Sequence, residues 1–404
     1  MKKILSLVLC LGVLFSACAE TGIPTAVPTP IKYDTTLAFC ADTHYVSSGD
    51  DGVKLSAREM PYNRYIVAAL LYDCMKNGFN TLLILGDLTN TGSEEEHSEM
   101  SALLQGAAEE GLDIYVLPGE CDLKTIGADG FKSTYGAFGF DKALSADTTS
   151  LSYSAVIEDK LVVMLDTTTP TGEFAGEVSA DTLQWLESQL IYAQEHRLKV
   201  ITASHNTLVN YVPQGQTNPY DMTNGDKLIE LLNRYAVQLH LSGHRHSRQV
   251  NSFGKGEEIM IDMPTKYPNS YGHLYFGQGE VTYLPHTVDV DGYAKKMHFT
   301  NRRLQNFNKY SKTYFDNTAS RYAQEQLDGK GLSKAQYQAA YDTFIKAYNG
   351  HMDGTLYTFK EDILQSEGYA VWQSDALKKT RHGQWMPVWL DKCNSKSNGF
   401  TRSF

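Results

Sequence analysis

The chain lacks a surplus of positive charge. Its 404 residues carry 36 lysines and arginines against 47 aspartates and glutamates, which gives a formal net charge of −11. Because binding to nucleic acid depends on many cationic contacts with phosphates, this balance argues against nucleic acid as a general partner. Any recognition of phosphate must therefore come from bound metal ions and a few placed side chains.

Cysteine is scarce and unpatterned. Four cysteines follow the N-terminal segment, with no CxxC pair and no regular spacing: Cys40, Cys74, Cys121 and Cys393. This excludes a disulfide framework as the basis of the fold. Cys40 and Cys74 are most simply small buried hydrophobic residues.

The sequence has no apolar run long enough to span a membrane, and its N-terminal segment carries one short apolar run. The basic start Met1–Lys3 precedes the apolar segment 4–15, which is too short to span a membrane. The following Phe15-Ser16-Ala17-Cys18 resembles a bacterial lipobox, which implies cleavage before Cys18 and lipid attachment to its sulfur. We therefore expect a signal peptide over 1–17, a tether over 18–33, and a lipid-anchored protein at the cell membrane or surface, outside the cytoplasm.

Strand-like apolar runs alternate with helical patterns from about residue 34 to residue 263. This alternation predicts an α/β fold in which two sheets lie between helices, as a four-layer α/β/β/α sandwich. Residues 247–299 look entirely β. We take 34–302 as one domain.

Residues 303–404 form a smaller and mainly helical C-terminal region of unknown role. Ser333 and Gln336 have the spacing of a capping box. The aromatic residues that follow recur at helical spacing and favour packing of a helix onto its domain, although they could line a ligand groove: Tyr337, Tyr341, Phe344 and Tyr348. The tail from Asn394 is expected to be poorly ordered.

Acidic residues and histidines end three of the predicted strands. They follow the apolar runs 36–41, 81–85 and 237–242, in the order Asp42-Thr43-His44, Gly86-Asp87 and Gly243-His244-Arg245-His246. Open α/β sheets bind ligands at the carboxyl ends of their strands. The ordered set therefore predicts one metal site at that edge.

These side chains suit a pair of divalent cations about 3.5–4 Å apart, which can hold a phosphoryl oxygen and activate a water. Such a pair needs a carboxylate between the metals and mixed nitrogen and oxygen ligands on either side. Asp87 is the expected bridge. Asp42, His44 and His246 would complete one site, and His244 would serve the other.

With these residues, the chain resembles the calcineurin-like metallophosphoesterase superfamily, and within it the bacterial enzymes related to class III cyclic nucleotide phosphodiesterases. The family order is DxH, GD, GNHD, a lone His and GHxH, and the resemblance covers about 34 to 300. It implies hydrolysis of phosphate monoesters or diesters by water activated on two divalent ions, or on one, with manganese, iron or zinc as the metal. The substrate stays open, from cyclic nucleotides and nucleotides to cell-wall phosphodiesters.

One family motif is altered. Where GNHD is expected, the chain has Gly119-Glu120-Cys121-Asp122. Glu120 replaces an Asn that binds the second metal in the family, and a carboxylate can ligate the same ion. Cys121 replaces a His that contacts the phosphate there and is often assigned as general acid; the thiol could donate a proton, favour zinc as a soft thiolate, or have no chemical role.

Two further positions complete the expected site. His205 is our choice for the second metal, but relatives often carry two adjacent histidines here, so Ser204 could occupy the ligand position instead. Arg245 could reach a phosphate as a bidentate donor or face the solvent. The expected catalytic set is Asp87, Glu120, Cys121, Asp122 and Arg245.

Two functions of different class follow. The first is a surface-anchored, metal-dependent phosphoesterase acting on a phosphate-ester substrate. The second is a degenerate relative that binds a metal or a phosphorylated ligand without turnover, which would account for Cys121. Glu120 favours the enzyme, because simple decay would not be expected to leave a metal-competent carboxylate there. A weaker third possibility is an adhesion or scaffold protein dominated by its C-terminal helices.

Overall fold

The computed structural model describes residues 35–47, 60–169, 174–209 and 221–404. The expected signal peptide, tether and lipid attachment at Cys18 lie outside these residues. Within the described ranges no helix has the length and apolar character needed to cross a membrane.

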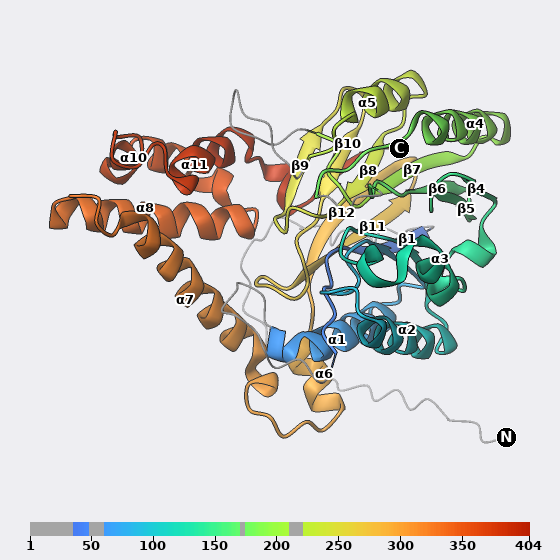
Figure 1. The fold of residues 1–404 in the computed structure, drawn as a ribbon, viewed down its shortest axis with the longest axis horizontal. Helices are drawn as coiled ribbons and strands as arrows, with labels where there is room; N and C mark the ends of the chain where they lie inside the picture. The colour runs from blue at the N-terminus through green and yellow to red at the C-terminus, as the bar shows by residue number, and fades with distance from the viewer. Residues whose placement is uncertain (1–34, 48–59, 170–173, 210–220) are drawn as a thin grey trace, which may run out of the picture. The chain divides into compact units, whose positions relative to one another are not determined.

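The first sheet has six strands in the order β13-β12-β11-β1-β2-β3. Figure 1 shows β12, β11 and β1 side by side. Their bounds are β1 Thr35–Cys40, β2 Thr81–Leu85, β3 Asp113–Leu117, β11 Ser270–Gly277, β12 Glu280–Thr287 and β13 Phe400–Ser403. The strands β1, β2 and β3 are parallel, while β11 joins β1 antiparallel. The loops that follow β1, β2 and β3 therefore leave from one edge of this sheet.

The second sheet has seven strands in the order β4-β5-β6-β7-β8-β10-β9. Their bounds are β4 Ser145–Ala146, β5 Tyr153–Ile157, β6 Lys160–Leu165, β7 Lys199–Ser204, β8 Leu239–Ser242, β9 Gln249–Ser252 and β10 Glu257–Met260. β6, β7, β8 and β10 are parallel, and β4, β5 and β9 are antiparallel additions. The loops after β7 and β8 thus share an edge, as those of the first sheet do.

The two sheets pack face to face through a shared apolar core. Leu37 and Phe39 of β1 meet residues of the second sheet such as Ile201 and Leu241 in this core. The intervening Ala38 belongs to a different cluster on the outer face of the first sheet. This alternation follows from the period of two along a strand, and because both faces are covered, central strands such as β2 and β6 are almost entirely apolar.

Helices cover both outer faces, which completes the four-layer α/β/β/α sandwich predicted from the sequence. Over the first sheet lie α1 Asn63–Lys76, α2 Glu94–Glu109, α3 Leu123–Tyr135 and α6 Val290–Lys296. Over the second sheet lie α4 Ala180–His196 and α5 Gly225–Arg234. The helix α6 corrects the expectation that 247–299 are entirely β, because Asp289 caps a new helix just after β12.

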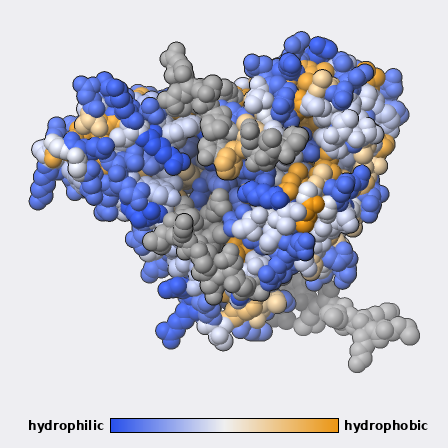
Figure 2. All heavy atoms as spheres, in the orientation of Figure 1, coloured by the Kyte–Doolittle hydropathy of each residue, from blue (hydrophilic) through white to orange (hydrophobic). Residues whose placement is uncertain are grey.

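The C-terminal region is helical and has its own apolar core. Its helices are α7 Phe307–Leu327, α8 Lys334–Met352, α9 Lys360–Leu364, α10 Glu367–Trp372 and α11 Arg381–Lys392. The capping box of Ser333 and Gln336 is present. Phe344 and Tyr348 are buried in this core, so the aromatic stripe packs the helix as expected. The outer surface of these helices is mainly hydrophilic in Figure 2.

The chain end is ordered, contrary to the expectation for the tail from Asn394. β13 pairs antiparallel with β12 at the edge of the first sheet. Phe404 is buried and lies with its ring centroid 5.1 Å from that of Phe276. The polar composition of the tail misled the prediction, because an edge strand gains its stability from a ladder and two aromatic contacts rather than from its own sequence.

Candidate metal centre

The expected site residues follow five parallel strands whose carboxyl ends meet. Loops after β1, β2 and β3 bring in the acidic residues of the first sheet, and loops after β7 and β8 bring in the histidines of the second. Several of these residues have left-handed backbone, with φ of 56° at Asp42, 42° at His44, 48° at Asp87, 65° at His244 and 50° at His246. Such strained backbone clusters at functional sites, where the surrounding structure holds it.

Asp42, His44 and His246 form the first group of ligands. Nε2 of His246 lies 3.2 Å from Oδ1 of Asp42 and 3.1 Å from Nε2 of His44. The other carboxylate oxygen of Asp42 accepts a hydrogen bond from the backbone N–H of His244 at 2.8 Å. Asp42 Oδ1 is buried, and no donor among the described residues is aligned with it. An oxygen and two imidazole nitrogens therefore converge on one position.

Glu120, His205 and His244 form the second group. Oε2 of Glu120 lies 2.9 Å from Nε2 of His205 and 3.3 Å from Nδ1 of His244. Nδ1 of His205 lies 2.8 Å from the carbonyl oxygen of Leu85, and an N–H there donates to that oxygen. This bond fixes the ring and directs Nε2 toward Glu120, as second-shell partners of metal-binding histidines do.

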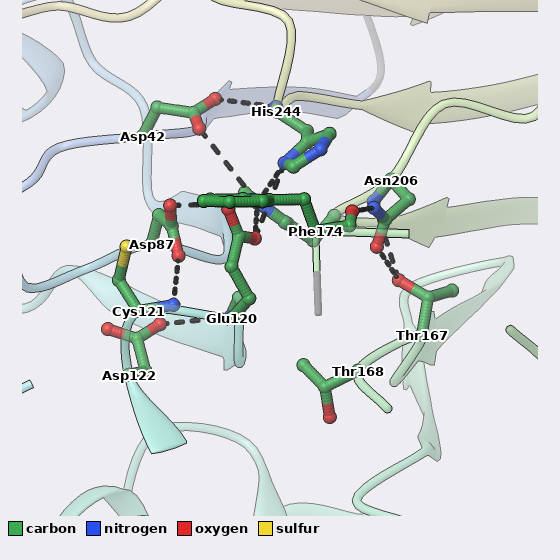
Figure 3. Close-up of polar contacts among 12 residues, drawn as sticks. Asp42, Asp87, Glu120, Cys121, Asp122, Thr167, Thr168, Phe174, Asn206 and His244 are labelled. Atoms are coloured by element: carbon green, nitrogen blue, oxygen red, sulfur yellow. Dashed lines mark hydrogen bonds and ion pairs between the residues drawn. The ribbon is translucent and has the colours of Figure 1, made fainter. Parts of the chain in front are cut away.

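Asp87 lies between the two groups. Its Oδ2 is 3.5 Å from Nε2 of His44 in the first group and 3.8 Å from Nε2 of His205 in the second. Its Oδ1 accepts a hydrogen bond from the backbone N–H of Cys121 at 2.8 Å. Figure 3 shows Asp87 beside Cys121 and facing the same region as Glu120. One oxygen is thus free of backbone bonding and placed to bridge two ions.

The electrostatics of this cluster call for cations. Burial raises the pKa of Asp87 to about 8, and the neighbouring carboxylates Glu120, Asp122 and Asp42 add to the rise, while His205 opposes it. Burial also works against a charge on His205, but Asp87 and Glu120 hold its pKa well above the ordinary value. In the metal-free chain, protons on Asp87 and His205 thus offset the negative charge that metal ions would otherwise balance. Three buried carboxylates and four imidazoles fit divalent ions with mixed nitrogen and oxygen ligands.

Close approach of the loops requires glycine at the ends of β2 and β3. A Cβ at Gly86, whose φ is 81°, would lie 2.6 Å from Nδ1 of His205. A Cβ at Gly119 would lie 2.4 Å from the backbone nitrogen of Asp87. Gly86 lets the ligand loops of the two sheets touch, and Gly119 lets the loops after β2 and β3 touch, so these glycines serve geometry rather than chemistry.

Comparison with known proteins identifies this arrangement. The model of the calcineurin-like phosphoesterase family matches residues 35–248, which hold every residue of both ligand groups. The chain belongs to the calcineurin-like phosphoesterase family. It is a phosphoric ester hydrolase by this membership, and divalent metals suit its site. A second model, the C-terminal domain of cyclic nucleotide phosphodiesterase, matches residues 289–388.

Two relatives illustrate the likeness. A protein of Rhodococcus erythropolis named "Probable cyclic nucleotide phosphodiesterase" is 26% identical over 235 residues, which cover 57% of this chain and 71% of that protein. A dimetal phosphatase from Danio rerio is 13% identical and superposes with a TM-score of 0.50, over 64% of this chain and 100% of that chain. The second likeness concerns the fold alone.

The structure of this phosphoesterase favours His205 over Ser204 at the ligand position. Nε2 of His205 lies in the cluster, whereas the Ser204 hydroxyl donates to the carbonyl oxygen of Asn206 at 2.7 Å. The same hydroxyl lies 2.9 Å from Nε2 of His240. His240 also contacts Thr202 at 2.9 Å, and burial lowers its pKa to about 3, so it is a satisfied core histidine.

Among the described residues, Asp122 lies outside the groups that could hold a metal, and its carboxylate is bonded to the neighbouring loops. Its carboxylate accepts hydrogen bonds from the backbone N–H groups of Gly119, Leu88 and Thr89 at 2.9, 3.1 and 2.9 Å, and from the Thr89 hydroxyl at 2.8 Å. These bonds tie the loop after β3 to the loop after β2. Asp122 is therefore a positioning residue for Asp87 and Glu120, because its oxygens are already saturated.

Arg245 also turns away from the two ligand groups. Its guanidinium forms an ion pair with Asp221 at 3.5 Å and lies 5.0 Å from the ring centroid of Trp385 on α11. The solvent-facing alternative is therefore wrong, because the side chain is only 11% exposed, while a contact of Arg245 with phosphate stays a prediction. Successive side chains of the loop after β8 point in different directions. His244 and His246 lie in the site, and Arg245 lies beside Trp385 of α11.

Sequence reasoning missed the side chains that hold the ligand loops. Nδ2 of Asn63 donates to the carbonyl oxygens of Thr43 and His44 at 2.9 and 2.8 Å. Glu258 is fully buried and accepts from the backbone N–H groups of Leu208 and Val209 at 2.6 and 3.0 Å. Glu258 lies in a short strand that begins with two acidic residues, so its sequence gave no clear signal of a buried carboxylate. Nothing local pointed to Asn63.

Proposed function

We propose that this phosphoesterase hydrolyses phosphodiesters with the help of two divalent cations, outside the cytoplasm. The observation that carries the proposal is the position of Asp87 Oδ2, within 3.5 Å of one ligand group and 3.8 Å of the other. A binding protein with a single ion would not need a buried bridging carboxylate. The surplus negative charge around that oxygen would be costly unless it were matched by more than one cation.

Cations held here would polarise a phosphoryl oxygen and lower the pKa of a coordinated water. Asp42, His44 and His246 would hold one ion, and Glu120, His205 and His244 the other, with Asp87 shared. Manganese, iron and zinc all suit such mixed ligands. The protein's own contribution is rigidity, since each loop is fixed by backbone bonds before a substrate arrives.

The state of Cys121 bears on the substrate. Burial raises the pKa of its thiol, and Asp87 and Glu120 raise it further, so the group stays protonated and is a poor proton donor at neutral pH. Leaving groups that need no protonation are therefore favoured. The names of the C-terminal family model and of the Rhodococcus erythropolis relative support a diester, including a cyclic nucleotide, over a monoester.

The test is hydrolysis of bis(4-nitrophenyl) phosphate by the full chain after loading with manganese, zinc or iron. Asp87→Asn should abolish turnover, and Asp181→Asn, which removes an exposed carboxylate on α4, is the matched control. We expect activity with at least one metal, retained in the control. A folded protein with no turnover under any metal would overturn the catalytic proposal and leave a binding protein.

Anchoring through lipid on Cys18 is a separate part of the proposal and rests on the lipobox-like sequence. Expression of the full chain in a bacterial host with labelled palmitate should give a labelled protein in the membrane fraction, and Cys18→Ser should carry no label. A wild-type protein without label, or equal labelling of both proteins, would refute the anchor without affecting the chemistry.

A further inference from the structure

Lys124 brings an ammonium group to the rim of the metal centre. Its Nζ lies 3.4 Å from Sγ of Cys121. That sulfur is within 4.8 Å of the ligand atoms of His44 and Asp87. Lys124 is the second residue of α3, so its cation stands at the edge of the cluster on the side of the helix N-terminus.

The loop before α2 packs closely against the first atoms of the Lys124 side chain. A Cβ at Gly92 would lie 2.3 Å from the carbonyl oxygen of Cys121 and 3.4 Å from Cβ of Lys124. The loop is held there by Glu96, which accepts from the backbone N–H groups of Thr91 and Gly92 at 2.7 and 3.1 Å. The backbone around Lys124 is therefore closely packed, and its Nζ lies beside Sγ of Cys121.

A thiol sulfur is a weak hydrogen-bond partner for an ammonium group. Sulfur accepts hydrogen bonds poorly, and a lysine offers three donors on a flexible stem. A phosphate oxygen is a stronger acceptor, and its bonds to a cation are charge-assisted. An anion that reaches the ligand atoms of His44 and Asp87 next to Cys121 comes within reach of this amine.

We propose that Lys124 binds a non-bridging oxygen of the substrate phosphate and stabilises its charge during hydrolysis. This inference rests on the proposed function, because it assigns a residue to the same site. The cation would contact the substrate directly, beside Cys121 at the edge of the ligand groups. Its contribution should appear in the binding of inorganic phosphate as well as in turnover.

The experiment compares Lys124→Met, Lys124→Arg and the control Lys132→Met in the full, metal-loaded chain. Lys132 lies on the same helix and is exposed, so its variant makes the same change in net charge away from the site. We measure kcat/KM for bis(4-nitrophenyl) phosphate, the affinity for inorganic phosphate by calorimetry, and metal content. Lys124→Met should lower kcat/KM by about 10- to 100-fold, the range for one charge-assisted hydrogen bond.

Lys124→Arg should stay within about fivefold of the wild type because it keeps the charge and the donors. Phosphate affinity should fall in Lys124→Met and not in Lys132→Met, with metal content unchanged in both. Unchanged phosphate affinity, or loss of bound metal in Lys124→Met, would overturn the proposal. So would a loss that grows with the pKa of the leaving group, since it would mean proton donation instead of oxygen binding.

These readouts separate the two proposals. An inactive wild type would sink the proposed phosphodiesterase, but calorimetry with inorganic phosphate would still decide whether Lys124 binds the anion. An active wild type with a fully active Lys124→Met would sink the role of Lys124 alone.

Discussion

Replacing Asp87 by Asn should stabilise the metal-free protein and weaken the metal-loaded one. Asn keeps the size of the side chain and its bond from the backbone N–H of Cys121, but it removes the charge between the ligand groups. Burial, together with nearby carboxylates, raises the pKa of Asp87 from 3.8 to about 8. Each pKa unit corresponds to about 1.4 kcal/mol, so this buried carboxyl costs the fold on the order of 5 kcal/mol above pH 8.

The net gain is smaller because His205 loses a neighbouring anion in the variant. We expect Asp87→Asn to raise the free energy of unfolding by about 2 kcal/mol without metal at pH 8. The folded pKa of Asp87 is raised, so the penalty is absent below about pH 4, grows as the pH rises, and is complete above about pH 8. The advantage of the variant should therefore shrink toward pH 5.

Melting temperatures in EDTA and in excess metal measure this. With an unfolding entropy of about 2.1 cal/mol/K per residue, a chain of this size shifts by about 1 °C per kcal/mol, so Asp87→Asn should melt about 2 °C higher in EDTA. Metal at 1,000 times its Kd stabilises the wild type by about 4 kcal/mol per ion. The wild type should then gain about 4–5 °C per ion, and the variant less than half of that.

Two results would refute the reasoning. The variant could melt below the wild type in EDTA at pH 8, which would mean that the carboxylate stabilises the fold without metal. Alternatively, metal could raise both melting temperatures equally, which would mean that Asp87 bridges nothing. Asp181→Asn, on the surface, should follow the wild type throughout.

Three further predictions address the remaining features. His205→Ala should lower the bound metal, measured by elemental analysis, by one ion per chain. Ser204→Ala should keep both ions and lower the free energy of unfolding by about 1 kcal/mol, because the contact with His240 is lost. The reverse pattern would place Ser204 at the ligand position. Cys121→His should raise kcat/KM for diesters with poor leaving groups by at least about tenfold, because an imidazole donates a proton near neutral pH, and an unchanged leaving-group dependence would contradict this. Removal of residues 400–404 should lower the free energy of unfolding in urea by about 2–4 kcal/mol, since it removes β13 and buried Phe404, and unchanged stability would show that the strand contributes nothing.

The sequence by itself determined the layered fold and most of the ligand set. Alternating apolar strands and amphipathic helices dictate two covered sheets, because each element must bury its apolar face. Short polar motifs at strand ends predict a shared edge, since parallel strands bring their carboxyl ends together. Asp42, His44, Asp87, His244 and His246 could therefore be assigned from the pattern alone, and the structure brings them into one cluster.

Only the tertiary structure decided how single side chains are used. Ser204 and His205 are neighbours in sequence, and the bond from His205 to the carbonyl oxygen of Leu85 is what selects the histidine. Asp122 and Arg245 lie inside recognised motifs, yet backbone amides take the carboxylate, and Asp221 with Trp385 takes the guanidinium. The hydrogen-bond and ion-pair partners of these side chains are distant in sequence. A local sequence pattern does not show which distant group will contact a given side chain. The same reason explains the ordered tail, whose strand exists because β12 offers it an unpaired edge.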